Sequence, residues 1–162
     1  MAITLTMYPE EIAALQRLAE GYRLMFRMPN DSVAYLTGDD FVVSVSVDLD
    51  GAAIWYYDVI NGSEVKSYAL GFLLFQKRNP VRVPDIPYAD NRDQVRYQLQ
   101  WVISAVANYG SDVLSGRREW FSEYIWDVSD VRGDLRDRIL TAISLRKSMM
   151  EHFGGTSSAA AT

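Results

Sequence analysis

The chain has 162 residues and a formal net charge of −5, with 49% hydrophobic and 23% charged residues. This length and composition predict one globular domain with a sizeable core and exclude a wholly disordered chain. The sequence contains no cysteine and one histidine, which excludes disulfide frameworks, zinc sites built from these residues, cysteine nucleophiles and cysteine-ligated haem or iron–sulfur clusters.

The first predicted element is a helix that begins at Pro9, a residue suited to the first helical turn. Apolar residues then recur at the spacing of one helical face, namely Ile12, Leu15, Ala19, Tyr22 and Phe26. Pro29 is expected to end this helix. A short strand over residues 33–37 and a turn at Gly38 are predicted to follow.

The next region has the pattern of a β-meander. Residues 41–49 alternate between an apolar and a mostly polar series, which predicts a strand with two unlike faces. Asp50-Gly51 and Asn61-Gly62 are hairpin signals. Strands are therefore predicted over residues 52–60 and 64–76, the second being long or bent.

Two-residue loops at both hairpins would fix which side chains share a face of the sheet. In that register Val47 lies opposite Ile54, and Trp55 lies opposite Tyr68. The face expected to pack on the helices carries Val43, Val45, Val47, Ile54, Tyr56, Val65 and Ala69. The opposite face carries Ser44, Ser46, Asp48, Trp55, Tyr57, Glu64, Lys66 and Tyr68. This second face is either an interaction surface or the docking site of a C-terminal helix.

A proline-rich segment over residues 78–90 predicts an extended linker between the sheet and a helical half. One apolar stripe predicts a helix over 95–109 that stops at Gly110. Residues 120–128 favour either a shorter helix or a strand.

The last apolar stripe, over residues 135–153, predicts a helix that ends at Gly154-Gly155. A mobile tail over residues 156–162 is expected to follow a single domain over residues 1–155. The order of elements predicts an α+β fold, with an N-terminal helix, an antiparallel β-meander of 3–5 strands, and C-terminal helices packed on one sheet face.

Negative charge concentrates in the predicted meander. Residues 28–65 contain seven acids and no lysine or arginine, whereas residues 91–162 contain nine acids and nine bases. Such a region repels nucleic-acid phosphates and attracts a cationic partner, although turns and solvated strand faces also favour aspartate. The predicted partner-binding residues are the acids Asp39, Asp40, Asp48, Asp50, Asp58 and Glu64 and the aromatic residues Trp55, Tyr57 and Tyr68.

Residues 43–51, Val-Ser-Val-Ser-Val-Asp-Leu-Asp-Gly, resemble the first motif of haloacid-dehalogenase-type phosphotransferases. The resemblance implies a magnesium-dependent enzyme with Asp48 as the nucleophile and Asp50 as the acid–base. Ala52 stands where that family has threonine or valine, and the family's strand is buried on both faces. If the chain after Gly51 returns as an antiparallel strand, such a site cannot form.

The remaining motifs are few. His152 lies near the end of the last predicted helix, where an imidazolium favours the helix dipole. The N-terminus lacks the segments of a secretory signal, and the longest apolar run, over residues 69–75, is too short to span a membrane. We therefore expect a cytoplasmic protein with no metal or cofactor.

These features favour a non-enzymatic protein that binds another protein, and neither nucleic acid nor membranes. The profile is that of a bacterial immunity or antitoxin-type inhibitor that captures a basic toxin domain. The acids would steer the partner, and the aromatic side chains would supply buried area. An acidic secretion chaperone or adaptor, a class in which homodimers are common, and the magnesium phosphotransferase at Asp48 and Asp50 are the alternatives.

Overall fold

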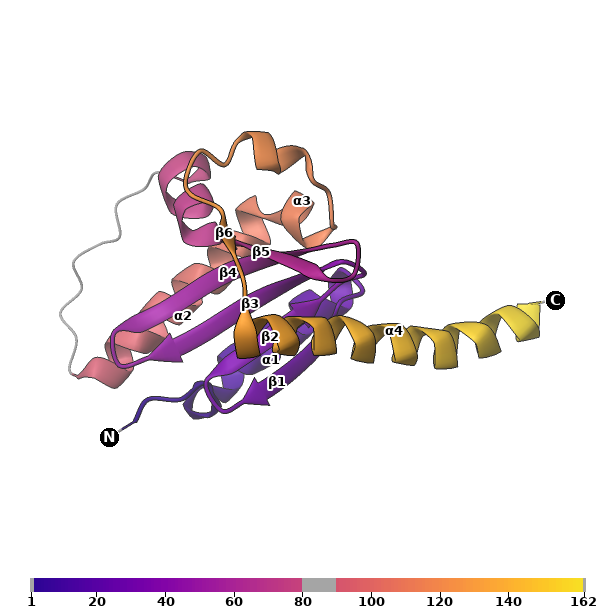
Figure 1. Ribbon diagram of the computed structural model, residues 1–162. Coiled ribbons are helices and arrows are strands. Elements are labelled where there is room, and N and C mark those ends of the chain that lie inside the picture. The colour runs from indigo at the N-terminus through magenta and orange to yellow at the C-terminus, as the bar shows by residue number, and fades with distance from the viewer. Residues whose placement is uncertain (1, 80–89, 162) are drawn as a thin grey trace.

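An antiparallel sheet of six strands, hydrogen-bonded in the order β1-β2-β3-β4-β5-β6, has helices on both faces (Figure 1). The computed structural model describes residues 2–79 and 90–161, so most of the predicted linker lies outside the described residues. The elements are η1 (Leu5–Met7), α1 (Pro9–Gly21), β1 (Met25–Asn30), β2 (Val33–Thr37), β3 (Phe41–Asp48), β4 (Gly51–Ile60), β5 (Glu64–Ala69), η2 (Phe72–Arg78), α2 (Asn91–Tyr109), α3 (Ser111–Leu114), η3 (Glu119–Ser122), β6 (Ser129–Asp130) and α4 (Gly133–Ala161). The α+β class predicted from the sequence is confirmed.

The first helix is shorter than predicted, because the chain turns into strand β1. Helix α1 begins at Pro9 but ends at Gly21, and Arg23 adopts a left-handed φ of 58°. The apolar residues that follow, Leu24, Phe26 and Met28, also fit the two-residue period of a strand, and all three pack into the main core. The helical spacing alone could not distinguish these two patterns.

Both hairpins differ in register from the prediction. In the first, Asp48 pairs with Gly51, so Leu49 and Asp50 form the loop and Val47 lies opposite Ala52. This shift of two residues leaves every β4 side chain on its predicted face. The β4–β5 loop has three residues instead of two, with Ile60 opposite Glu64. A one-residue change moves all β5 side chains to the other face.

Strand β5 ends earlier than predicted. The segment after Ala69 forms η2, a π-helix in which the Asn79 N–H donates to the Leu74 carbonyl at 2.9 Å. The Ala69 N–H itself donates to the Tyr124 hydroxyl at 3.0 Å, so a side chain takes the place of the next strand partner. The predicted strand over residues 64–76 is therefore wrong in its second half.

In the C-terminal half, α2 confirms its predicted helix, with the Asp90 carboxylate accepting the Asp93 N–H at 3.0 Å as an N-cap. The segment over residues 120–128 is neither a helix nor a strand beyond the short η3. Helix α4 continues to Ala161 instead of stopping at Gly154.

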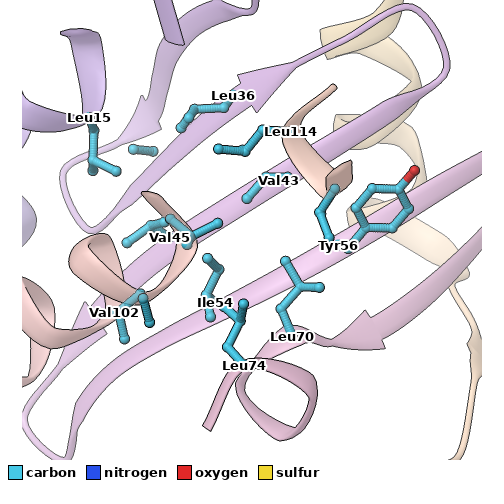
Figure 2. Packing of buried hydrophobic residues seen from close by; sticks show 14 of the residues in the cluster. Leu15, Leu36, Val43, Val45, Ile54, Tyr56, Leu70, Leu74, Val102 and Leu114 are labelled. Carbon is cyan, nitrogen blue, oxygen red and sulfur yellow. The ribbon is translucent and has the colours of Figure 1, made fainter. Parts of the chain in front are cut away.

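The helices divide between the two faces of the sheet instead of sharing one. Helices α1, α2 and α3 cover the larger core. Figure 2 shows residues of this core from both strands and helices. Helix α4 covers part of the opposite face through a smaller cluster that contains Tyr35, Val42, Tyr57, Ile139 and Ala142. The alternative in which a C-terminal helix docks on the second face is the one observed.

Candidate functional site

Four of the predicted binding acids lie at one end of the sheet, which we call the paired end because each contacts a cation. It is formed by the β2–β3 and β4–β5 turns. Asp39 binds Arg146 from α4, and Glu64 lies 3.4 Å from Lys66. Arg118 contacts both Asp40 at 2.7 Å and Asp58 at 2.9 Å. Each of these four acids therefore contacts a cation of the chain, with Arg118 shared between two of them.

Asp58 is the most enclosed of these acids, with 3% of its surface exposed. It lies on the main core face, opposite Phe41 and beside Tyr56. Burial raises the pKa of the Asp58 carboxyl, and the Arg118 guanidinium opposes that rise. Burial also raises the pKa of the Tyr56 hydroxyl, with the Asp58 charge adding to the effect. Its burial and its contact with Arg118 leave the Asp58 carboxylate inaccessible to a partner.

The three predicted aromatic residues do not form one surface. Tyr57 is buried under α4, with 7% of its surface exposed. Tyr68 lies on the other face, where its ring stacks on Phe121 with centroids 4.8 Å apart. Only Trp55 remains accessible, at 37% exposure. The predicted aromatic surface was wrong for Tyr68 because of the one-residue change in the β4–β5 register.

The other end of the sheet, which we call the hairpin end, is formed by the β1–β2 and β3–β4 turns. It carries Asp31, Asp48 and Asp50, all exposed, and none of the three forms an ion pair with any described residue. The Asp48 carboxylate accepts the N–H groups of Asp50 and Gly51 at 2.8 and 3.1 Å, which fixes the turn. Leu49, at its tip, is 56% exposed.

The turn geometry also bears on the resemblance to phosphotransferases. Gly51 begins β4, which runs antiparallel to β3, where the family's first motif needs a different continuation. Asp48 and Asp50 therefore lie in a hairpin. Within residues 2–79 and 90–161, no group of three or more histidine, aspartate or glutamate side chains could hold a metal ion.

Beside the hairpin end lies an open apolar groove of about 370 Å³, which we call the edge notch. It is lined by Ala52, Ala53, Ile54, Trp55, Ala69, Gly71, Phe72, Phe75, Gln76 and Val102. The notch exists because β5 ends at Ala69, opposite Trp55, and leaves the first residues of β4 without a strand partner on that side.

The π-helix η2 supplies the aromatic wall of the edge notch. Phe72, 41% exposed, stacks on Trp126 with centroids 5.5 Å apart, and Phe75 stacks on Trp101 at 6.2 Å. π-Helical turns occur frequently at functional sites. The sequence prediction missed these residues because it assigned them to a strand. The helical spacing of the buried Leu70, Leu73 and Leu74 was the signal that could have located this element.

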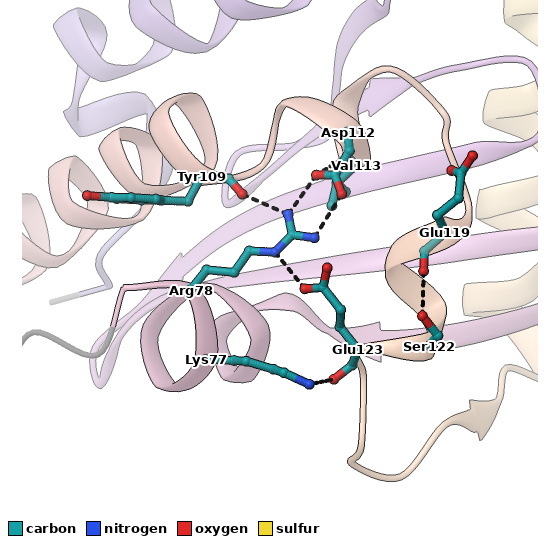
Figure 3. Close-up of polar contacts among 8 residues, drawn as sticks. All are labelled: Lys77, Arg78, Tyr109, Asp112, Val113, Glu119, Ser122 and Glu123. Atoms are coloured by element: carbon teal, nitrogen blue, oxygen red, sulfur yellow. Dashed lines mark hydrogen bonds and ion pairs between the residues drawn. The ribbon is translucent and has the colours of Figure 1, made fainter.

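A third polar cluster surrounds Arg78 and has a structural role (Figure 3). Its guanidinium donates to both Asp112 carboxylate oxygens at 2.6 and 2.8 Å, to Glu123 at 3.0 Å and to the Tyr109 carbonyl at 2.8 Å. These bonds raise the pKa of Arg78 and lower that of Asp112. These four hydrogen bonds join η2, α2, α3 and the segment after η3.

The described residues contain no helix that is both long and apolar enough to cross a membrane. Comparisons of this chain with protein-family models, with curated proteins and with solved structures found no match.

Proposed function

We propose that this protein is a non-enzymatic, cytoplasmic inhibitor of the immunity or antitoxin type, which captures a basic protein partner at the hairpin end. The observation that carries the proposal is the contrast between the acids. Asp48 and Asp50 are exposed and have no cation in the described chain, whereas Asp39, Asp40, Asp58 and Glu64 each contact one. A field without internal compensation is the one that a cationic partner can neutralise.

The surroundings of these acids supply the apolar part of an interface. Leu49 lies between the two carboxylates at 56% exposure, and the edge notch begins at Ala52, with Trp55 and Phe72 accessible on its rim. Aromatic residues near charged ones are the side chains that most often dominate binding energy. The proposed interface is therefore smaller than the predicted sheet face and lies at one end of it.

Affinity capture from the native host, followed by titration of the purified partner, tests the proposal. We expect Asp48→Asn combined with Asp50→Asn to weaken binding at least about tenfold, an effect that shrinks as salt is added. The matched control combines Glu20→Gln with Glu151→Gln, two exposed acids far from the hairpin end along the chain, and changes the net charge equally.

In a growth assay, cells that express the partner should survive with the wild-type protein and the control, and fail with the hairpin-end variant. A partner that binds both variants with equal affinity would refute capture at this end. A partner that is acidic, or whose binding does not respond to salt, would refute the electrostatic part of the proposal.

A further inference from the structure

We infer that the edge notch receives an extended segment of the partner, which adds as a strand beside β4 and places a lysine or arginine against Asp48 and Asp50. This inference rests on the proposed function and specifies how the partner binds. The occupant is thus an extended peptide with apolar side chains and a flanking positive charge, rather than a helix or a flat protein surface.

The part of β4 that β5 leaves unpaired supports strand addition. Strand β4 runs from Gly51 to Ile60, but β5 opposes it only from Trp55 onward. The Ala52 N–H points away from β3, because it donates to the Gln98 side chain of α2 at 3.2 Å. Backbone groups two residues apart in a strand point the same way, so the Ala52 C=O and the Ile54 N–H face the side that β5 leaves open, while the pairing of Trp55 with Ala69 uses the Ile54 C=O. An added strand pairs with these two groups, and the Ala52 N–H stays on Gln98.

The shape of the edge notch limits what can enter. Its floor includes Val102 of α2, one wall is the edge of β4, and the other is η2 with Phe72 and Phe75. An extended chain projects alternate side chains to opposite sides. One series would therefore contact Val102 and Phe75, while the next would lie near the exposed rings of Trp55 and Phe72.

Charge selects the sequence of the occupant. Asp48 pairs with Gly51, the residue before the notch-lining Ala52, so both acids of the turn lie at one end of the notch. A strand beside Ala52–Trp55 that continued past the turn would bring its next side chains to these carboxylates. A lysine or arginine there gains an ion pair, and a glutamate or aspartate meets like charges.

Strand addition can be tested with a labelled nine-residue peptide, Lys-Thr-Val-Thr-Val-Thr-Val-Thr-Lys, and the full-length protein in a fluorescence polarisation titration. One comparison peptide carries glutamate at both ends. A second has N-methyl groups on its central valines, which remove backbone donors and leave the side chains unchanged. We expect saturable binding of the first peptide, and about fivefold to tenfold weaker binding of the methylated one, as lost hydrogen bonds predict.

A protein variant supplies the second comparison. Ala53 is exposed and lines the edge notch, so Ala53→Trp should fill it and reduce peptide binding at least about tenfold. Ala107→Trp, at an exposed position of α2, is the matched control and should bind as the wild type does. The methylated peptide is tested on the wild-type protein, so this readout stands even if Ala53→Trp fails to fold.

Equal binding of the methylated peptide, absence of binding by the lysine peptide, or preference for the glutamate peptide would each overturn the inference. A dimer that forms with concentration and is abolished by Ala53→Trp would also overturn it, because a second copy would then occupy the notch. The proposed function fails separately, when the captured partner binds the Asp48→Asn and Asp50→Asn variant as tightly as the wild type.

Discussion

At the paired end of the sheet, acids from the β2–β3 turn, β4 and β5 contact cations. These cations come from α4, β5 and the segment before η3. At the hairpin end, three acids of the same strand region remain exposed and without ion pairs among the described residues. The two ends are built from the same base-free stretch of sequence, residues 28–65. They differ because long-range folding brings Arg118 and Arg146 to one end only.

The comparison shows what a charge count along the chain can and cannot establish. Asp40 and Arg118 are 78 residues apart in sequence, and Asp39 and Arg146 are 107 apart. A stretch without bases therefore has its acids paired with cations at one end and unpaired among the described residues at the other. Asp39, Asp40 and Asp58 contact cations brought by distant segments, and the acids of the hairpin end form no ion pair with a described residue.

The largest expected effect is at the paired end. Arg118→Met would leave Asp58 without its cation at 3% exposure, which should lower the free energy of unfolding by about 3 kcal/mol. Urea unfolding at neutral pH measures the loss. Arg117→Met is the control, because Arg117 is exposed and forms no ion pair with a described residue.

Combining Arg118→Met with Asp58→Asn should recover part of that loss, since the buried charge is then removed together with its partner. If Arg118→Met and Arg117→Met unfold at the same urea concentration, Asp58 does not depend on Arg118. The distinction between the two ends would then be wrong.

The stability of the hairpin end depends on backbone conformation, whereas that of the paired end depends on ion pairs. Gly51 has a φ of 145°, and a Cβ atom there would lie 1.9 Å from the Gln98 Oε1 that accepts the Ala52 N–H. Gly51→Ala should therefore cost about 2 kcal/mol through backbone strain and the displaced hydrogen bond. Thermal unfolding followed by circular dichroism measures this.

Gly62→Ala separates the two causes. Gly62 also has a positive φ, of 74°, but nothing lies within 4 Å of a Cβ placed there. Its cost should be about 1 kcal/mol, from the left-handed conformation alone. A Gly51→Ala cost no larger than that of Gly62→Ala would show that Gln98 moves without loss.

The elements that the sequence predicted best are those whose signals are local. Helix α2 combines an apolar stripe with Asp90 as its N-cap, and the sequence of β3 shows a clear two-residue period between turn residues. Strand β1 was missed because its local pattern is ambiguous, and η2 was missed because a long-range contact ends β5. The spacing of Phe26 fits both a helix and a strand, and β5 ends where the hydroxyl of Tyr124, 55 residues away, binds the Ala69 N–H.

The candidate site was predicted in part. Asp48, Asp50 and Trp55 are exposed near one another in the chain, because a hairpin signal and strand alternation locate them. Their role in binding remains a prediction. The ion pair of Asp58 and the position of Tyr68 could not be predicted. The first needs Arg118 from a distant segment, and the second depends on whether the β4–β5 loop has two or three residues.

Two carboxylates of the molecule should respond oppositely to pH. Burial raises the pKa of Asp58 above its ordinary 3.8, so the folded state binds its proton more tightly than the unfolded state. The protonated Asp58 carboxyl therefore stabilises the folded state at pH values below its pKa in the unfolded chain. This contribution is lost as the pH rises through its pKa in the folded chain. The bonds from Arg78 lower the pKa of Asp112, so its contribution is present above 3.8 and is lost as the pH falls through the folded pKa.

Unfolding free energies of the wild type, Asp58→Asn and Asp112→Asn across the acid range test these signs. The stability of the wild type relative to Asp58→Asn should fall as the pH rises through this window. Relative to Asp112→Asn, it should fall as the pH is lowered. Two slopes of the same sign would contradict the assignment of Asp58 as a carboxyl dominated by burial.

The smallest effect should come from the exposed acids of the hairpin end. Asp50→Asn removes a charge that no cation balances, and Asp48→Asn keeps an oxygen that can accept the N–H groups of the turn. Each should change the free energy of unfolding by less than about 0.5 kcal/mol.

Asp40→Asn, which removes one of the two carboxylates on Arg118, should lower the free energy of unfolding by more than this. Urea midpoints compared in low and high salt measure both effects. If salt lowers the stability of the wild type but not that of Asp40→Asn, the ion pairs of the paired end stabilise the fold, because added salt screens attraction there. If instead Asp50→Asn destabilises the chain as much as Asp40→Asn, the hairpin-end acids are structural, and no charge at that end is left for a partner.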